Sequence, residues 1–452
     1  MNMTTTQKSA VLRRLGDGLI LRRATPEDAE ALGDFNARIH SDDGPENPDD
    51  RLGAWTRDLL TLPHPTFSPG DFTIVEDTAA GKIVSSVNLI SQTWAYEGIP
   101  FGMGRPELVG TDPAYRKRGL VRVQFETVHE WSRQRGELVQ GITGIPYYYR
   151  QFGYEMGLEL GGGRAGFGSH VPKLKEGETE PYRLRPAAEA DAPFLTGLFN
   201  EAGKRQHIAA VWDEALWRYE IGGKSERNVN RYEVRLIERV SDGRVVGALT
   251  HPWFLWGNHD MLAATSYELL PGVSWLDVTP SVIRYLWQTG GEYAEREKSQ
   301  LHAFGFWHGS SHPVYELFGE LLPRLRQPYA WYVRVADLPG FVRHIAPALE
   351  KRLEASYLPG FSGEARISFY RSGLRLVFEN GKLTVSEPWQ PGPGLPTDAG
   401  FPDLTFLSLV FGRKSFDELD DEFPDCWWDN NRTHALLSTL FPKKASSVMG
   451  VV

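Results

Sequence analysis

The chain has 452 residues, of which 41% are hydrophobic and 12% aromatic; this composition excludes a disordered protein and gives a length sufficient for roughly two to four domains. The single cysteine, Cys426, excludes an internal disulfide framework and a cysteine-rich zinc site, and a formal net charge of -9 argues against general DNA binding. No run approaches the ~20 apolar residues of a membrane span, and the first residues lack a signal-peptide core, so we expect a cytoplasmic protein.

An internal repeat organises most of the chain. The stretch "LRRATPEDAEALGDFNA" (Leu21–Ala37) recurs as "LRPAAEADAPFLTGLFNEA" (Leu184–Ala202), and each predicts a strand, an acidic helix cap and an amphipathic helix. A second pair, "YRQFGY" (Tyr149–Tyr154) and "YELFGE" (Tyr315–Glu320), shares Tyr-x-x-Phe-Gly at nearly the same distance from the first pair. Two matches in the same order predict two related modules of similar length.

The first module carries a basic turn between a predicted strand and a predicted helix. The strand is "PELVGTDP" (106–113), and the helix occupies 120–135, where apolar residues recur at helical spacing. Gly119 lies where the strand gives way to the helix, a position at which free backbone N–H groups and the helix dipole favour an anion. With the three cations Arg116–Arg118 beside it, this turn suits a pyrophosphate. A solvated turn before an ordinary helix is the alternative interpretation.

A second strand and a tyrosine-rich turn follow this helix. The segment "LVQGITGIPYYYRQFGYEMG" places Tyr147, Tyr148 and Tyr149 in the turn, just before Phe152 and Gly153. Beyond them, the glycines within 161–166 satisfy G-x-G-x-x-G, but no convincing helix begins there, so we reject a dinucleotide-binding site.

The second module lacks the basic turn, and the C-terminal region is predicted to be a separate unit. The counterpart region 267–291 contains no arginine–glycine pair, so we expect it to be architectural. His308 and His312 are four residues apart, but the intervening Gly309-Ser310 does not suit a helical metal pair, and we expect no metal site. After residue 337, a helical stretch and several short strand candidates joined by glycine turns predict a separate α+β unit.

The order of strand, basic glycine turn, helix, strand and Tyr-x-x-Phe-Gly resembles the GCN5-related N-acetyltransferases (GNAT). In that family an Arg/Gln-x-x-Gly-x-Gly/Ala loop holds the pyrophosphate of acetyl-CoA, and a tyrosine four residues before the late glycine protonates the departing thiolate. The resemblance therefore implies acetyl-CoA as co-substrate and Tyr149 as the acid. It implies a set of cofactor-binding residues: Val109, Gly110, Thr111, Arg116, Lys117, Arg118, Gly119, Leu120 and Val121. Val121 departs from the family pattern, which usually has Gly or Ala there.

The narrower resemblance is to acetyltransferases of the enhanced intracellular survival type, whose basic turn is often Arg-Arg-Arg-Gly-Leu followed by an aliphatic residue. That type implies an α/β and α+β fold class in which tandem acetyltransferase-like modules, with mixed sheets flanked by helices, precede a sterol-carrier-like α+β domain. Here the implied units are a catalytic module at 18–175, a degenerate module at 176–337 and the third domain at 338–452. The type also implies a homo-oligomer, and it places the carboxylate of the last residue, here Val452, in the first module as catalytic base.

The expected function is acetyl-CoA-dependent N-acetylation of a primary amine, on a small molecule or on a lysine. The acidic loop His40–Asp50 and nearby Trp55 lie where the family forms part of its acceptor cleft, which favours a cationic acceptor; a solvated loop is the alternative. The base remains open among the Val452 carboxylate, Glu107 and water. We expect neither a nucleic-acid nor a membrane partner. The alternative function is a non-catalytic CoA-binding, lipid-binding or assembly protein acting through its C-terminal domain.

Overall fold

The computed structural model describes residues 11–452. Residues 1–10, on which the expectation of no signal peptide depends in part, lie outside the described residues. The largest sheet has nine strands, of which eight form the ordered path β1-β2-β3-β4-β5-β6-β17-β7 and β10 pairs with β4. The bounds are β1 Val11–Gly16, β2 Leu19–Arg23, β3 Phe72–Asp77, β4 Lys82–Tyr96, β5 Ile99–Thr111, β6 Val139–Ile142, β7 Glu155–Leu160, β10 Ile208–Ala210 and β17 Tyr329–Arg334.

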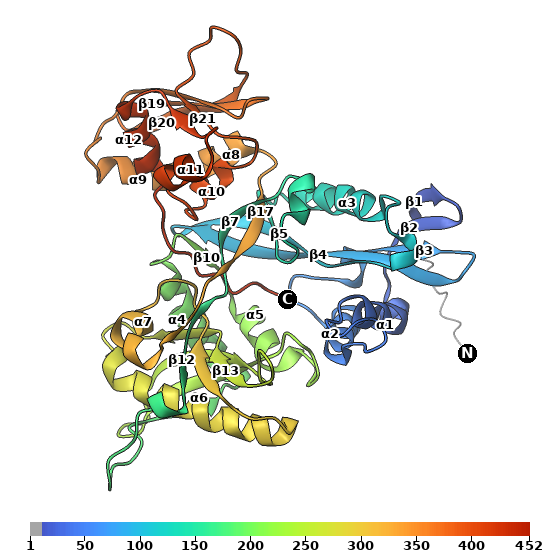
Figure 1. Cartoon of the computed structure of the whole chain (residues 1–452), viewed down its shortest axis with the longest axis vertical. Helices are drawn as coiled ribbons and strands as arrows, with labels where there is room; N and C mark the ends of the chain where they lie inside the picture. The colour runs from blue at the N-terminus through green and yellow to red at the C-terminus, as the bar shows by residue number, and fades with distance from the viewer. Residues whose placement is uncertain (1–10) are drawn as a thin grey trace.

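Helices cover both faces of this sheet. Figure 1 shows α3 (Leu120–Gln134) on one face and α1 (Ala29–Ile39) with α2 (Asp50–Thr61) on the other. The side chains alternate accordingly: Val87 and Leu89 of β4 pack with the apolar residues of α3, whereas Ile90 packs with those of α1 and α2. The helix predicted over 120–135 is therefore observed, and its apolar stripe is buried against the sheet.

Two four-stranded sheets are formed by strands that lie between residues 163 and 326. Their orders are β14-β12-β11-β9 and β13-β15-β8-β16. The strands are β8 Gly163–Phe167, β9 Tyr182–Pro186, β11 Tyr232–Arg239, β12 Val245–Pro252, β13 Met261–Ala264, β14 Ser266–Leu269, β15 Ala303–Phe306 and β16 Arg324–Arg326. The helices are α4 Ala192–Gly203, α5 Glu214–Arg218, α6 Trp275–Glu297 and α7 Pro313–Leu317. The β13-β15-β8-β16 sheet is mixed, because β13 and β15 run parallel while β8 runs antiparallel to β15, whereas the pairs of the β14-β12-β11-β9 sheet are all antiparallel.

The predicted repeat is visible at the start of each module. Arg22 makes a two-pronged ion pair with Asp28, with N–O distances of 2.7 and 2.8 Å. Arg185 and Asp191 make the same pair at 2.7 and 2.9 Å. Each aspartate also accepts a hydrogen bond from a backbone N–H three residues earlier and leads directly into a helix, α1 or α4. The matched residues therefore fix the angle between strand and helix in the same way twice.

The two modules exchange a strand. β17, from late in the chain, lies between β6 and β7, and β8, which follows directly after β7, lies between β15 and β16. The exchanged strand β8 explains the glycines of the rejected dinucleotide motif. A Cβ on Gly163 would meet the Phe306 carbonyl, and one on Gly166 would meet the Leu321 carbonyl. The unit limits 18–175 and 176–337 remain a prediction, and strands cross them in both directions.

The C-terminal unit has one five-stranded sheet with helices packed on it. Its order is β20-β19-β18-β21-β22. The strands are β18 Gly363–Ser368, β19 Gly373–Glu379, β20 Lys382–Trp389, β21 Ala399–Gly400 and β22 Trp427–Trp428; the helices are α8 Leu338–His344, α9 Ala346–Glu354, α10 Phe406–Val410, α11 Phe416–Glu422 and α12 Asn431–Leu440. These elements confirm the predicted α+β unit and, with the two mixed-sheet modules, the predicted fold class. The likeness of this unit to sterol carriers remains a prediction.

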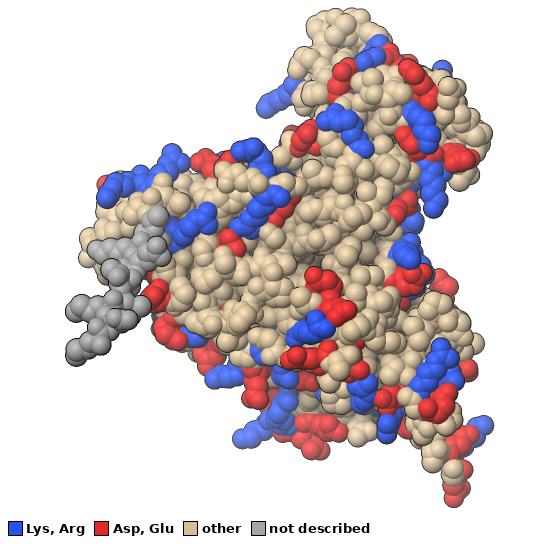
Figure 2. Space-filling model, turned by 180° about the vertical axis from the view of Figure 1, so that it is seen from behind, with Lys and Arg blue, Asp and Glu red and all other residues tan. Residues whose placement is uncertain are grey.

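The C-terminal unit is docked firmly on the first module. One continuous apolar cluster joins Trp94 and Phe101 of the large sheet to Phe341 and Phe411 of the C-terminal unit. On the face seen in Figure 2, acidic and basic side chains are interspersed and neither sign forms a continuous field. Within residues 11–452, none of the helices combines the length and apolar character that crossing a membrane requires.

Candidate functional site

One open cavity of about 600 Å³ in the first module contains most of the residues that the sequence singled out. It is lined by Tyr149 and by all the residues predicted to contact the cofactor, namely Val109, Gly110, Thr111, Arg116, Lys117, Arg118, Gly119, Leu120 and Val121. Ile39, His40, Tyr115, Arg122, Ile145, Tyr148, Gln151 and Phe152 complete the lining. Val452 does not line this cavity.

The cavity exists because two neighbouring strands separate. β5 and β6 pair only at Met103 with Val139 and at Gly104 with Gln140, after which β5 continues without β6. The free part of β5 also contains a bulge, where Leu108 and Val109 lie opposite the single residue Val87 and Leu108 has a φ of 50°. A bulge leaves backbone groups outside the regular ladder, so the separated strand offers N–H donors to a ligand.

The turn 116–119 has the geometry of an anion site. Lys117 and Gly119 both have positive φ, 64° and 73°, which turns successive backbone N–H groups toward one point. Helix α3 begins at Leu120, and its N-cap, Gly119, has no side chain with which to cap the first free N–H groups. Arg118 pairs with exposed Asp17 at 2.8 Å, whereas Arg116 and Lys117 form no ion pair with any residue in 11–452.

Tyr149 projects from the short 3-10 helix η4 (Tyr148–Phe152) and is only 5% exposed. Its ring packs against those of Phe125, Tyr148, Tyr154 and Tyr332, which hold it in one orientation. Burial, followed by the nearby negative charge of Glu107, raises the pKa of the phenol above its usual range. Among the described residues its hydroxyl has no hydrogen-bond partner. The protonated phenol is therefore free to donate to a ligand in the cavity.

Tyr315 is the counterpart of Tyr149 in the second module, and its hydroxyl is occupied. It donates to the Phe306 carbonyl at 2.8 Å and accepts from the His308 backbone N–H at 3.0 Å. Helix α6, which follows β14 in the second module, also differs from α3. Its N-terminus is capped by the Ser274 hydroxyl and carries Asp277 in its first turn. An acidic, capped helix N-terminus does not attract a phosphate.

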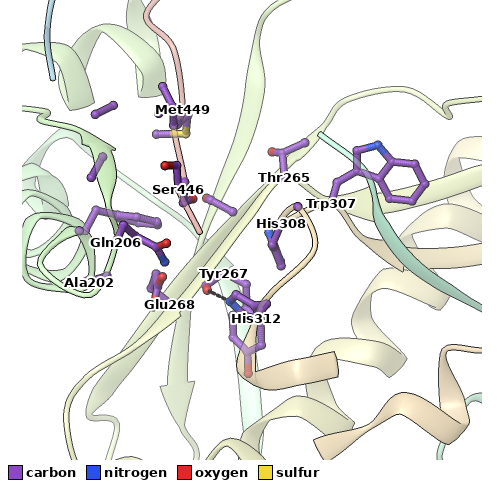
Figure 3. A pocket seen from close by; sticks show the side chains of 18 of the residues that line it. Ala202, Gln206, Thr265, Tyr267, Glu268, Trp307, His308, His312, Ser446 and Met449 are labelled. Atoms are coloured by element: carbon purple, nitrogen blue, oxygen red, sulfur yellow. Dashed lines mark hydrogen bonds between the residues drawn. The ribbon is translucent and has the colours of Figure 1, made fainter. Parts of the chain in front are cut away.

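The corresponding cleft of the second module is small and lacks cationic side chains. It encloses about 100 Å³, its lining includes no lysine or arginine, and the chain segment Ser446–Met449 closes one side. Figure 3 shows His308 and His312 projecting into it, with His312 bound through Nε2 to the Tyr267 carbonyl at 3.1 Å. Nδ1 of His312 accepts from the Val314 backbone N–H, so both of its nitrogens are engaged within the protein. No group of three or more metal-ligating side chains occurs in the part of the chain that the structure describes.

The end of the chain threads back to the first module. The Ser447 backbone N–H donates to the Ile208 carbonyl, and the Trp212 indole N–H donates to the Met449 carbonyl at 2.9 Å. The Val451 carbonyl accepts from Gln92 at 2.9 Å and from Arg105 at 3.0 Å. Val452 is 6% exposed and belongs to the apolar cluster between α2 and the sheet, and the C label in Figure 1 marks this position beside α2.

Glu107, the alternative base, has a partner of its own. Arg105 lies 2.6 Å from its carboxylate and also holds the Val451 carbonyl, so one arginine links this strand to the end of the chain. In the predicted acceptor region, Asp49 caps α2 by accepting from the Arg51 backbone N–H, and Trp55 is buried in the apolar cluster. Part of the acidic loop therefore serves the helix, and Trp55 does not line an open cleft.

His40 is a cavity residue that the sequence named only as the start of the acidic loop and to which it gave no chemical role. It follows the last residue of α1 and lines the same cavity as Tyr149. Its only sequence signal is a histidine at the end of a predicted helix, next to the acidic loop. Its relation to β5 depends on the packing of α1 across the sheet, which periodicity alone does not specify.

Comparison with known proteins supports an acetyltransferase-like first module. Residues 23–157 match the family model of the acetyltransferase (GNAT) domain. No curated protein sequence matches the chain. Among solved structures, a GCN5-related N-acetyltransferase from Anabaena variabilis is similar with a TM-score of 0.63 at 14% identity, covering 95% of this chain and 99% of that one.

Two further structures are similar over nearly their whole length. A probable N-acyltransferase from Enterococcus faecalis has a TM-score of 0.65 at 14% identity and covers 96% of this chain and 100% of its own. Eis1 from Mycobacterium abscessus has a TM-score of 0.56 at 11% identity and covers 96% and 99%. At these identities the likeness establishes the fold, which extends over all three parts of the chain.

Proposed function

We propose that the chain is an acetyl-CoA-dependent N-acetyltransferase that acetylates a primary amine of a cationic acceptor. One observation carries the proposal: the anion-binding turn at 116–119 and the unengaged hydroxyl of Tyr149 line the same cavity. A protein that only bound a nucleotide would need the first feature and not the second. The match of residues 23–157 to the GNAT domain supports acyl transfer in general.

The cavity residues suit a thioester substrate that carries a pyrophosphate. Acetyl-CoA supplies the acetyl thioester, and residues 116–121 would hold its pyrophosphate through backbone N–H groups and the charges of Arg116 and Lys117. Val109–Thr111 lie on the free part of β5, beside which the pantetheine arm would run. N–H groups at the Leu108 bulge would face the thioester carbonyl and stabilise negative charge that develops on its oxygen.

Tyr149 takes the role of acid in this proposal. The departing thiolate must gain a proton, and a phenol whose pKa is raised by burial stays protonated at neutral pH. The attacking amine must also lose a proton. The Val452 carboxylate, Glu107 and water are the bases that the sequence leaves open, and the structure adds His40 to them.

The proposals for the acceptor, the location, the oligomeric state and the subtype rest on the sequence. We propose a small-molecule amine or a lysine as acceptor, because the acidic loop 40–50 borders the first module, and neither a nucleic acid nor a membrane as partner. A cytoplasmic location, a homo-oligomer, a subtype close to the enhanced intracellular survival acetyltransferases and a sterol-carrier-like third domain belong to the same proposal.

The direct test is release of free CoA thiol from acetyl-CoA in the presence of a panel of amines. We expect release that requires both the full chain and an amine, with polyamines and aminoglycoside-like amines faster than neutral alkylamines of equal size. Calorimetry should show one CoA site per chain. Absence of thiol release with every amine, despite CoA binding, would leave a binding protein rather than an enzyme.

A second candidate function is ligand binding by the C-terminal unit, and one observation favours it. An open cavity of about 670 Å³ in that unit is lined mainly by apolar side chains, among them Leu338, Phe369, Leu374, Phe406 and Leu407. A fluorescent fatty acid should bind there if this cavity serves a lipid. Binding that a Leu374→Asp substitution abolishes, without loss of thiol release, would assign the cavity a role separate from acetyl transfer.

A further inference from the structure

His40 occupies a position from which it can reach a ligand at the separated part of β5. Helix α1 packs so closely on this strand that a Cβ on Gly110 would lie 3.3 Å from Nε2 of His40 and 2.9 Å from Ile39. The absence of a side chain at Gly110 therefore allows the imidazole to lie directly against the strand. That strand segment, His40 and Tyr149 all line the same cavity.

The imidazole is buried against β5, and one of its two nitrogens is not satisfied by the protein. Nε2 of His40 is buried and has no hydrogen-bond partner among residues 11–452. A buried polar atom without a partner is costly, and such atoms in native structures call for an explanation such as a ligand or a catalytic role. Here the atom lies beside a cavity that suits an acyl thioester.

We propose that His40 is the general base that deprotonates the acceptor amine, with Glu107 as the residue that stabilises the resulting imidazolium. This inference rests on the proposed acetyltransferase function and replaces Val452 and Glu107 as base. His40 contacts the reacting nitrogen, and Glu107 acts through His40.

The charges around His40 agree with this role. Burial lowers the pKa of His40 below its ordinary value, so the ring is neutral at pH 7 and can accept a proton. The Glu107 carboxylate and the Leu108 carbonyl, both from β5, favour the charged form and would stabilise it once the proton arrives. The other charged or titratable side chains that line the cavity are Tyr115, Tyr148 and Tyr149 and the cations Arg116, Lys117, Arg118 and Arg122.

The two alternative bases are less well placed. Glu107 is already paired with Arg105 at 2.6 Å and does not line the cavity. The end of the chain is fixed through the Val451 carbonyl by Gln92 and Arg105, and Val452 lies outside the cavity lining. His64, which lies against the Val452 backbone, is another buried histidine, but it also lies outside that lining.

The proton balance is complete with these residues and water. His40 accepts one proton from the acceptor ammonium, and the free amine attacks the thioester carbonyl so that a C–N bond forms and the C–S bond breaks. Tyr149 gives its proton to the leaving thiolate and is reprotonated by the second proton that the nitrogen loses. His40 returns its proton to solvent, so one ammonium and one thioester give one amide, one thiol and one proton.

The test compares two acceptors that differ in their need for a base. A simple alkylamine is almost wholly protonated at pH 7, whereas hydrazine is a much weaker base and has a far larger unprotonated fraction at that pH. We expect His40→Gln to lower kcat/KM for the alkylamine by ~10² or more, the size typical of a lost general base, and to change the hydrazine rate by less than about 5-fold. Added imidazole should restore part of the alkylamine rate in His40→Ala.

His308→Gln is the matched control, because Nε2 of His308 is also buried without a partner but lies in the second module's cleft. We expect this variant to match the wild type with both amines. Glu107→Gln should move the acidic limb of the alkylamine pH–rate profile to lower pH, since loss of the carboxylate removes a charge that favours the imidazolium. Removal of Val452 should leave the ratio of alkylamine to hydrazine rates unchanged.

Several outcomes would overturn the assignment. Equal rates for His40→Gln and wild type with the alkylamine would exclude His40 as base, and equal losses with both amines together with weaker CoA binding would make it a packing residue. Loss of the alkylamine rate only on removal of Val452 would return the role to the end of the chain. A wild-type protein that releases no thiol even with hydrazine would overturn the acetyltransferase function itself. Unfolding curves of each variant, and a His40→Asn substitution, separate these results from misfolding.

Discussion

The two repeats place a tyrosine at the same point in the fold, and the surroundings of each hydroxyl differ. Tyr315 is fixed by two backbone hydrogen bonds, so its proton is used for structure. Tyr149 has four aromatic neighbours and no hydrogen-bond partner among residues 11–452, so its proton remains available. The duplicated tyrosine has thus kept its packing role in both modules, but its hydroxyl is a free hydrogen-bond donor only in the first module.

Substitution of Tyr149 by Phe tests this difference. The ring packing survives, but the proton donor is lost, so we expect kcat to fall by ~10² to 10⁴ while CoA affinity stays within a factor of about 3. Steady-state thiol release and calorimetry measure the two quantities. Tyr148→Phe is the control, since it changes a neighbouring cavity tyrosine. A larger effect at Tyr148 than at Tyr149 would show that the acid is assigned one residue too late.

The sequence was informative about residues whose role is local. The basic turn and Tyr149 were predicted because a glycine between strand and helix, and a tyrosine at a fixed distance from a later glycine, are short-range patterns. His40 was not, because its proximity to Gly110 depends on how α1 crosses the sheet. The bonds from Gln92 and Arg105 to Val451 join parts of the chain too distant for any such pattern.

At the scale of elements, the 116–119 turn and α3 act together as one anion site. Arg116→Ala removes a cation that forms no ion pair in the described chain, and we expect the binding free energy of CoA to weaken by about 1.5–3 kcal/mol, or roughly 10- to 100-fold in affinity. Arg118→Ala should cost less, because Asp17 already shares that charge. Calorimetric titration with CoA measures both. Arg133→Ala, on the exposed end of α3 and paired within residues 11–452 with Glu130 alone, should bind as the wild type does.

Most individual elements follow from local sequence, whereas their pairing does not. The helix at 120–135 and the strand–helix openings of both modules were predicted. The strand predicted over 106–113 is the end of a longer strand, β5, which begins at Ile99 and includes Gly102, Gly104 and Pro106. These residues weaken a strand pattern, but here they serve close packing, since a Cβ on Gly104 would meet Glu137. The strand exchange had no local signal at all.

The exchange predicts that a fragment comprising residues 11–175 does not fold alone. Without β17, the edges of β6 and β7 are left unpaired, and exposed edges promote aggregation. We expect the fragment to bind a hydrophobic dye and to show no cooperative thermal transition. Co-expression with residues 176–452 should restore a soluble complex. A single sharp transition for the fragment alone would mean that β6 and β7 pair directly in its absence.

At the scale of the molecule, Glu97 joins the parts of the chain. Its carboxylate lies 3.1 Å from Arg352 and 2.6 Å from Lys444 of the C-terminal unit, and 3.8 Å from His207. Burial alone would raise the pKa of Glu97, but its partners His207, Lys444 and Arg352 outweigh burial and lower the pKa below the ordinary value of 4.5. The contribution of this group to stability is therefore complete at neutral pH and declines as the pH falls below about 4.5 toward the folded pKa.

Glu97→Gln should lower the free energy of unfolding at pH 7 by about 1.5–3 kcal/mol, the usual range for hydrogen bonds to a charged group. The difference between variant and wild type should shrink as the pH is lowered through the acidic range. Chemical denaturation between pH 3 and pH 7 measures both effects. Glu126→Gln, which removes one partner of an exposed ion pair, should be neutral. A difference that grows on acidification would contradict the sign of the pKa shift.

The strand exchange also determines when the sheet of the first module can be completed during synthesis of the chain. β7 ends at Leu160 and β17 begins at Tyr329, so the ribosome completes the edges of the gap long before it makes the strand that fills it. At ~5–20 residues per second, this interval lasts roughly 10 to 30 seconds. During that time the first module of the nascent chain has two unpaired strand edges. A ribosome that stalls within the second module therefore leaves an aggregation-prone intermediate and not a smaller folded enzyme.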